Sequence, residues 1–267
     1  LGLALEDLQG SGVDGALTLA DVERAAAAVP AAPTTAAPMR ATKTGFDPAQ
    51  MRQAIAAAMS RSKREIPHYY LGSTLDFDAA SRWLQAHNRD LGPAERLLPA
   101  VLLLKATALA LQQLQQLNGF YENGAWRAGT GVHLGWAISL RGGGLVAPAI
   151  HDADRKTLPE LMNALRDLVQ RARSGGLRSS ELTDPTVTVT SLGERGADSV
   201  YGVIYPPQVA ILGFGQVALR PWVVDGQVVA RPLVQASLAA DHRASDGHLG
   251  GQLLAAIDRA LQSPDTL

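Results

Sequence analysis

Apolar residues recur along this chain at two different spacings, and the spacing predicts where helices and strands lie. Met51, Ile55 and Met59 are four residues apart, as on one face of a helix, and Pro48 before them suits a first helical turn. Residues 131–140 instead alternate between apolar and polar side chains, which is typical of a strand. We therefore expect helices that start at 47 and span 77–91, 95–117, 157–175 and 245–263, and strands over 68–77, 131–140, 144–150, 185–193, 206–217 and 220–240.

The turns between these strands indicate how the sheet is built. Asp225 and Gly226 lie in the middle of segment 220–240 and suit a two-residue hairpin turn. Hairpins alongside helical connections predict an α/β fold with a mixed rather than a purely parallel sheet. Residues 213–218, GFGQVA, match a dinucleotide-binding fingerprint, but that fingerprint requires a following helix. The residues that follow predict a strand, so we exclude a dinucleotide fold.

The pattern changes in the first 45 residues and predicts a separate small module. Residues 10–15 form a glycine-containing loop, and Thr18 suits the N-cap of a helix over 18–28. Residues 29–38 are rich in Pro, Ala and Thr without apolar periodicity, as in a semi-extended linker. We expect a module over 1–29, a linker over 30–45 and a large domain over 46–267. Because the first residue is leucine, we expect the sequence to be part of a longer protein.

Composition narrows the possible partners. The net charge is −1, which gives no bulk electrostatic case for binding nucleic acid or a membrane surface. The chain has no cysteine, so disulfides and thiolate chemistry of its own are excluded, and a reducing compartment fits. No apolar run approaches the roughly 18 residues of a membrane span. We expect a bacterial cytoplasmic location, with the mitochondrial matrix as the alternative.

The segment AADHRASDGH, residues 239–248, carries the best candidate chemistry. An imidazole has an ordinary pKa of about 6.5, so His242 could transfer protons near neutral pH. Asp241, Arg243 and Asp246 could orient it, and Gly247 permits a tight turn into the last helix. Spacing alone equally allows a plain helix start, with Ser245 as the cap and His242 without a role. We expect no metal site, because the histidines at 242 and 248 have no third ligand nearby.

The residues ADHRASDG resemble the D-H-R-x-x-D-G signature of the catalytic domain of dihydrolipoamide acyltransferases from 2-oxo acid dehydrogenase complexes. Further resemblance follows in collinear order through 51–77, 131–161, 186–217 and 225–247, so that it covers roughly residues 46–267. Residues 10–25 also resemble the second half of that family's peripheral subunit-binding domain, which docks dihydrolipoamide dehydrogenase.

The resemblance implies a fold, an assembly and partners. The fold is the two-layer, chloramphenicol acetyltransferase-like fold of CoA-dependent acyltransferases. Its building block is a trimer, and trimers assemble into a cubic or dodecahedral core. The implied reaction moves an acyl group between a dihydrolipoyl thiol, carried on a domain not present in this chain, and the thiol of CoA. The implied partners are the 2-oxo acid decarboxylase and dihydrolipoamide dehydrogenase components.

The resemblance also implies roles for individual residues. His242 is the general base, and Thr190 donates a hydrogen bond to the oxyanion, with Ser191 as the adjacent alternative. Asp246 keeps the loop rigid by pairing with an arginine, for which Arg52 and Arg243 are the candidates. In this family the hydroxyl and the histidine come from neighbouring subunits, so catalysis requires the trimer.

Departures from the family pattern leave two points open. Ala244 and Ser245 replace two residues that are usually aliphatic, and three glycines occupy 142–144 in place of a polar turn. The transferred group could therefore be acetyl, succinyl, branched-chain or another acyl group. Two other functions remain as alternatives, a structural core component without activity and a stand-alone CoA-dependent acetyltransferase. The first would be expected to lack His242.

Overall fold

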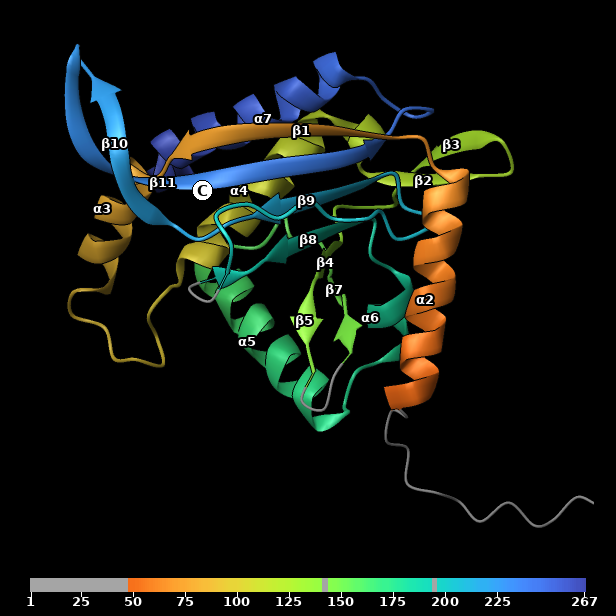
Figure 1. Cartoon of the computed structure of the whole chain (residues 1–267). Helices are drawn as coiled ribbons and strands as arrows, with labels where there is room; N and C mark the ends of the chain where they lie inside the picture. The colour runs from red at the N-terminus through yellow and green to blue at the C-terminus, as the bar shows by residue number, and fades with distance from the viewer. Residues whose placement is uncertain (1–47, 141–143, 194–195) are drawn as a thin grey trace, which may run out of the picture. The chain divides into compact units, whose positions relative to one another are not determined.

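The computed structural model describes residues 48–140, 144–193 and 196–267 (Figure 1). The predicted module over 1–29 and the linker over 30–45 lie outside the described residues, as do the first two residues of the predicted large domain. Everything that follows concerns the large domain.

A seven-stranded mixed sheet forms the centre of this domain, as the turn pattern predicted. Parallel pairing joins β8 to both β4 and β9, and the other pairs in the sheet are antiparallel. The strands run in the order β1 (His68–Asp76), β11 (Gln227–Asp241), β9 (Ala210–Phe214), β8 (Val187–Ser191), β4 (Leu134–Trp136) and β7 (Ala149–Ile150), and β10 (Ala218–Val224) pairs with β11.

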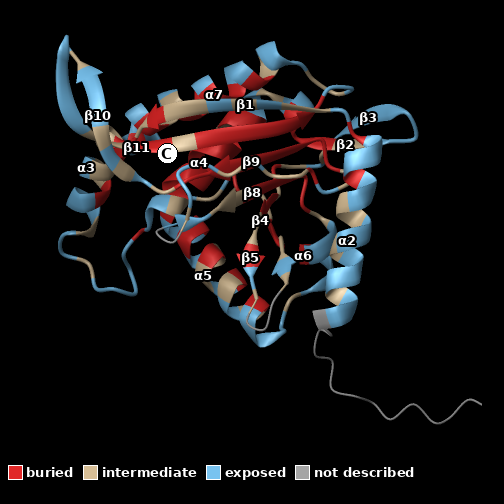
Figure 2. Ribbon diagram, in the orientation of Figure 1, coloured by how far each residue is buried: buried red, intermediate tan, exposed pale blue. Residues whose placement is uncertain are grey.

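Helices pack against both faces of the sheet, but the main core lies on one face. The main core unites apolar side chains of the sheet with those of α3 (Asp78–Asn88), α4 (Pro99–Gln113), α5 (Leu158–Ser174) and α7 (Gly247–Gln262). Leu102, Leu104 and Leu111 of α4 are fully buried, and Figure 2 shows the buried residues concentrated in α4 and the central strands. The remaining long helix, α2 (Pro48–Glu65), flanks the other face and is largely exposed.

One predicted helix and two predicted strands differ in extent from the expectation. The helix predicted over 95–117 begins at Pro99, which suits a first helical turn because proline lacks an N–H donor. It ends at Gln113, and a short 3₁₀ turn, η3 (Gln115–Leu117), follows. The strands predicted over 131–140 and 144–150 are each interrupted. The end of the first strand, β5 (Ile138–Ser139), pairs with the start of the second, β6 (Leu145–Val146), in a separate two-stranded ribbon.

Two elements were missed by the sequence pattern. One is the hairpin of β2 (Gly119–Glu122) and β3 (Ala125–Ala128), and the other is the short helix α6 (Ser179–Thr183). Asn123 and Gly124 turn the hairpin with φ of 53° and 79°, as a two-residue Asn-Gly turn requires. That dipeptide was the available signal. The other hairpin, β10–β11, turns at Asp225 and Gly226 as predicted, with φ of 51° and 77°.

The approach of α7 to the sheet depends on a glycine. A Cβ atom on Gly250 would lie 2.8 Å from Leu71 Cδ1 and 2.9 Å from Leu238 Cδ2, closer than atoms pack without movement. Gly250 therefore lets the first turns of α7 lie directly against β1 and β11. This contact holds the loop between β11 and α7, which carries residues 242–246, at the end of the sheet.

Candidate active site

The loop that follows β11 is closed on itself by backbone hydrogen bonds. The carbonyl of Asp241 accepts from Ala244 N at 3.0 Å and from Ser245 N at 3.1 Å. His242 N donates to the carbonyl of Pro67 at 2.9 Å, which ties the loop to the start of β1. These bonds fix the backbone on both sides of the histidine.

Asp246 ends this loop as the N-cap of α7. Its Oδ1 accepts a hydrogen bond from Leu249 N at 2.9 Å, and Gly247 is the first residue of the helix. The cap is therefore Asp246 rather than Ser245, which the sequence pattern suggested. A carboxylate in this position is favoured by the free N–H groups and the dipole at the helix start.

The carboxylate of Asp241 is fully buried and engages Arg243. Arg243 Nη2 lies 2.7 Å from Oδ2 and Nε lies 3.0 Å from Oδ1, and the backbone N of Arg243 donates to Oδ1 at 2.9 Å. The guanidinium also lies 4.0 Å from the ring centre of Tyr121 on β2. The hydrogen bonds that Arg243 donates to Asp241 raise the pKa of Arg243 above its ordinary value, so the guanidinium stays charged.

Neither arginine proposed from the sequence pairs with Asp246 within this chain. Arg243 is bound to Asp241 instead. Arg52 lies thirteen residues before the end of α2, and at 1.5 Å per residue this places it about 20 Å from that end along the helix axis. The loop of His242 is tied to Pro67, just beyond that end, so the side chain of Arg52 does not reach Asp246.

The imidazole of His242 is exposed and has a single neighbouring ring. Tyr69 on β1 packs against it edge-on, with ring centres 5.2 Å apart and planes at 65°. Neither ring nitrogen has a hydrogen-bond partner among the described residues. The imidazole opens to a hollow of about 410 Å³ that the 242–246 loop, His248, Leu249 and Gln116 line. Both nitrogens are thus accessible to a substrate.

Thr190 lies on the same sheet, but far from His242. Thr190 on β8 pairs with Gly213 on β9, and Gly213 pairs with Ser237 on β11. His242 is five residues beyond Ser237 and two strands away from β8. Strand dimensions of 3.3 Å per residue and 4.8 Å between strands give a separation of about 20 Å. The structure therefore does not bring the two residues together within one chain.

The hydroxyls of Thr190 and Ser191 differ in their surroundings. Ser191 Oγ accepts a hydrogen bond from Gly193 N at 3.3 Å, so it already belongs to the turn after β8. Thr190 Oγ1 has no hydrogen-bond partner in the part of the chain that the structure describes. Of the two, Thr190 is the hydroxyl left available to a substrate oxygen.

An apolar pocket of about 320 Å³ lies on the face of the sheet that Thr190 shares with Thr188. Met51, Ile55 and Met59 of α2 form one wall, so the periodic residues of that helix line this pocket. Two of its polar side chains are engaged within the chain, because Thr188 Oγ1 donates to Gln208 Oε1 at 2.7 Å and Gln208 Nε2 donates to the Pro185 carbonyl at 3.0 Å. Most of the residues that line the pocket are apolar.

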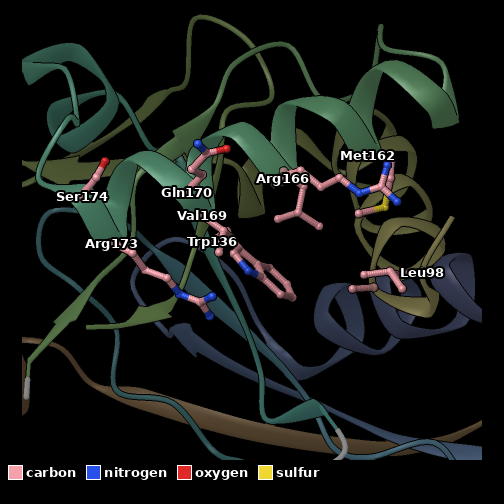
Figure 3. Close-up of a pocket in the computed structure, with 10 residues that line it drawn as sticks. Leu98, Trp136, Met162, Arg166, Val169, Gln170, Arg173 and Ser174 are labelled. Carbon is pink, nitrogen blue, oxygen red and sulfur yellow. The ribbon is translucent and has the colours of Figure 1, made fainter. Parts of the chain in front are cut away.

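A larger pocket, of about 600 Å³, lies between the start of α4 and α5 (Figure 3). Trp136 and Met162 line it, together with the guanidinium groups of Arg166 and Arg173. Arg166 donates to the carbonyls of Ala94 and Arg96 and so holds the loop before α4. None of the sequence-predicted site residues lines this pocket.

Two further observations concern the described residues as a whole. They include no group of three or more His, Asp or Glu side chains arranged to hold a metal ion. None of their helices is both long and apolar enough to cross a membrane.

Comparison with solved structures identifies the fold. Chloramphenicol acetyltransferase superposes with a TM-score of 0.54 at 11% identity, over 77% of this chain and 94% of that one. Two acyltransferase structures are more similar. Dihydrolipoamide acetyltransferase from Azotobacter vinelandii has a TM-score of 0.77 and 26% identity over 84% of this chain and 93% of that one. The cubic core of a pyruvate dehydrogenase multienzyme complex gives 0.76 and 26% over 89% and 98%. The chain thus has the chloramphenicol acetyltransferase-like fold, which it shares with these structures.

Sequence comparison identifies the family. The model of the 2-oxoacid dehydrogenases acyltransferase (catalytic domain) matches residues 42–267. The dihydrolipoyllysine-residue acetyltransferase component of the pyruvate dehydrogenase complex of Staphylococcus aureus (strain COL) is 33% identical over 298 residues, covering 100% of this chain and 67% of that protein. The chain belongs to the 2-oxoacid dehydrogenase acyltransferase family. This confirms the resemblance drawn from the sequence.

Proposed function

We propose that this chain transfers an acyl group between a dihydrolipoyl thiol and the thiol of CoA, with His242 as general base and Thr190 as oxyanion donor. The observation that carries the proposal is the loop of residues 241–246, which fixes the backbone of an exposed histidine at a substrate-sized hollow. The matching of residues 42–267 to an acyltransferase catalytic domain supports the reaction type.

The spacing of three residues supports their assignment. In the Azotobacter vinelandii enzyme, a serine, a histidine and an asparagine at intervals of 52 and 4 residues are the subject of investigations of the catalytic mechanism. Thr190, His242 and Asp246 stand at the same two intervals in this chain. Threonine supplies the same hydroxyl donor as serine. Asp246 retains the helix-capping acceptor, so its role here is to hold the loop rather than to relay a proton.

The chemistry follows from the ordinary properties of thiols. A free thiol has a pKa of about 8.5, so little thiolate is present at neutral pH. The neutral imidazole of His242 takes the proton from the attacking thiol as its sulfur bonds to the thioester carbonyl carbon. The carbonyl oxygen becomes an oxyanion, to which the hydroxyl of Thr190 donates a hydrogen bond. Collapse of this intermediate breaks the original C–S bond, and the departing thiolate takes the proton from the imidazolium.

A trimer would supply the geometry that one chain lacks. Thr190 and His242 are about 20 Å apart in a single chain. A complete site therefore needs His242 from one copy and Thr190 from a neighbouring copy. The β10–β11 hairpin projects from the domain (Figure 1). Leu219, Val223 and Val228 are 73%, 63% and 72% exposed. Such a patch marks an interaction surface, which supports self-association. The similarity to a cubic core supports further assembly of the trimers.

The apolar pocket beside β8 supports a hydrocarbon acyl chain on the transferred group. It lies on Thr190's face of the sheet, most of its lining residues are apolar, and its Thr188 and Gln208 side chains are hydrogen-bonded within the chain. A panel of acyl-CoA donors would show which acyl group fits best. The lipoyl group, the 2-oxo acid decarboxylase and dihydrolipoamide dehydrogenase are the partners we propose with this function, and a bacterial cytoplasmic location stays a prediction.

The test is acyl transfer from a panel of acyl-CoAs to free dihydrolipoamide, comparing the chain with His242→Ala. We expect kcat to fall by about 10²- to 10⁴-fold in the variant, with the oligomeric state unchanged. His87→Ala removes an exposed histidine from α3 and serves as the matched control, with activity retained. Equal turnover by the chain and His242→Ala would overturn the assignment of the base. No turnover with any donor from a well-assembled oligomer would overturn the proposed reaction.

A further inference from the structure

Tyr69 contacts the imidazole of His242 from outside the histidine's own loop. It lies on β1 opposite Ala240 of β11, two residues before the histidine. Its ring meets the imidazole edge-on, with centres 5.2 Å apart. This spacing is within the range for favourable aromatic pairs. Among the described residues it is also the only ring contact of His242.

The hydroxyl of Tyr69 is tied to the far end of the same loop. Tyr69 Oη lies 2.9 Å from Ser245 Oγ, and Ser245 N donates to the carbonyl of Asp241. Partial burial raises the pKa of Tyr69 above its ordinary value, so the hydroxyl keeps its proton at neutral pH. The ring is therefore anchored through Ser245 while its edge contacts the imidazole.

The packing around Tyr69 limits where its ring can go. A Cβ atom on Gly250 would lie 3.0 Å from Tyr69 Oη, so the backbone of α7 closes over the hydroxyl. The backbone of the loop is already fixed by Asp241, Arg243 and Pro67. These contacts leave the two side-chain torsions of His242 unrestrained, because neither ring nitrogen has a partner in the described part of the chain.

We propose that Tyr69, anchored by Ser245, is a positioning residue that restricts the imidazole of His242 to the orientation used in proton transfer. The proposal rests on the proposed function, because it takes His242 as the base. It goes beyond that function by assigning a role to two residues that touch neither thiol. It also gives a reason for a hydroxyl at Ser245, where the family pattern usually has an aliphatic residue.

The first test separates the ring from the hydroxyl by steady-state kinetics of acyl transfer. Tyr69→Leu should lower kcat by about 3- to 10-fold and leave both KM values within about twofold. Tyr69→Phe keeps the ring and should keep kcat within about twofold. The matched control is Tyr70→Leu, the same deletion on the neighbouring residue, whose ring is 42% exposed and makes no contact with His242. Wild-type kcat in a correctly assembled Tyr69→Leu would overturn the proposal.

A second measurement does not depend on acyl transfer. The rate at which diethyl pyrocarbonate modifies His242, followed by peptide mass spectrometry, should rise about 3-fold or more in Tyr69→Leu and by a smaller factor, below about twofold, in Tyr69→Phe. If the wild-type chain proved inactive, the proposed function would fail, while this rate would still decide whether Tyr69 restrains the ring. An unchanged rate in Tyr69→Leu would overturn the restraint.

If Tyr69→Leu does not assemble, a milder pair of variants decides the same point. Tyr69→Phe and Ser245→Ala each remove one half of the Oη–Oγ hydrogen bond. Their small effects on the modification rate should not add in the double variant, since either change alone breaks the bond. Fully additive effects, or no effect in all three, would show that the anchor does not act on His242.

Discussion

Thr190 lies on β8 and His242 directly follows the end of β11, two strands away in the same sheet and five residues beyond the register of Thr190, so that about 20 Å lies between them. A hydroxyl that stabilises an oxyanion must lie within hydrogen-bond distance of it, and the base must reach the attacking sulfur at the same carbonyl. One chain cannot satisfy both demands. In the proposed function, one chain therefore supplies the two halves to different active sites.

Thr190 should matter through its hydroxyl alone. Thr190→Val keeps the branched shape but removes the donor, and kcat should fall by about 10²- to 10³-fold, the usual effect of losing one oxyanion donor. Thr190→Ser should retain most activity. Ser191→Ala should cost little, because Ser191 Oγ is engaged with Gly193 N. Acyl transfer assays on the three variants check this, and a Ser191→Ala loss as large as that of Thr190→Val would contradict the choice of Thr190.

The buried ion pair of Asp241 and Arg243 should control the placement of the base. Asp241→Asn removes the carboxylate that accepts hydrogen bonds from both Nε and Nη2 of Arg243. We therefore expect kcat to fall by about tenfold or more and the thermal midpoint to be lower. Arg243→Lys keeps the charge but loses the planar fork, so it should resemble Asp241→Asn rather than the wild type. Kinetics and thermal unfolding at fixed protein concentration would measure both. Wild-type kcat in Asp241→Asn would show that the pair does not hold the loop.

Two adjacent glycines of α7 should respond in opposite directions to the same substitution. Gly250→Ala forces a methyl group against Leu71 and Leu238 and should destabilise the fold by about 1–3 kcal/mol. Nothing lies within 4 Å of a Cβ atom on Gly251, so Gly251→Ala should stabilise the helix by about 0.5–1 kcal/mol. Thermal midpoints of the two variants test this. Equal effects would contradict the close approach of α7 to β1.

A second buried ion pair should give the fold part of its acid sensitivity. Arg171 on α5 binds Glu181 on α6 through two hydrogen bonds of 2.6 and 2.7 Å, and these bonds lower the pKa of Glu181 below its ordinary value of 4.5. A carboxyl with a lowered pKa contributes stability above its unfolded pKa and loses it as the pH falls through the folded value. Glu181→Gln should therefore destabilise the fold by about 2–3 kcal/mol at pH 7 and by much less below pH 4.

Asp167→Asn is the matched control for that prediction. Asp167 also bonds Arg171, at 2.8 Å, but its side chain is 62% exposed against 7% for Glu181. Its loss should cost at most about 1 kcal/mol. Thermal midpoints measured from pH 3 to pH 8 would compare the variants. A gap between wild type and Glu181→Gln that stays constant with pH would contradict the lowered pKa.

The sequence predicted the parts of this structure that depend on local pattern. The mixed sheet, the Asp225–Gly226 hairpin and the helix after His242 follow from periodicity and turn chemistry. The side-chain contacts of the site residues could not be predicted from the sequence. They depend on three-dimensional distances, which the spacing of residues along the chain does not give. Arg243 was expected near Asp246, yet the buried carboxylate two residues earlier in the chain binds it. Tyr69 was missed as a neighbour of His242 because 173 residues separate them in sequence.

The proposed active site combines His242 of one subunit with Thr190 of another. Co-expression of His242→Ala and Thr190→Val, with different tags so that mixed assemblies can be isolated, tests this pairing. Each variant alone should be nearly inactive. In trimers that contain both variants, one site in three would combine an intact histidine with an intact threonine, so activity should recover to about a third of the wild-type value. No recovery from verified mixed trimers would contradict a shared site.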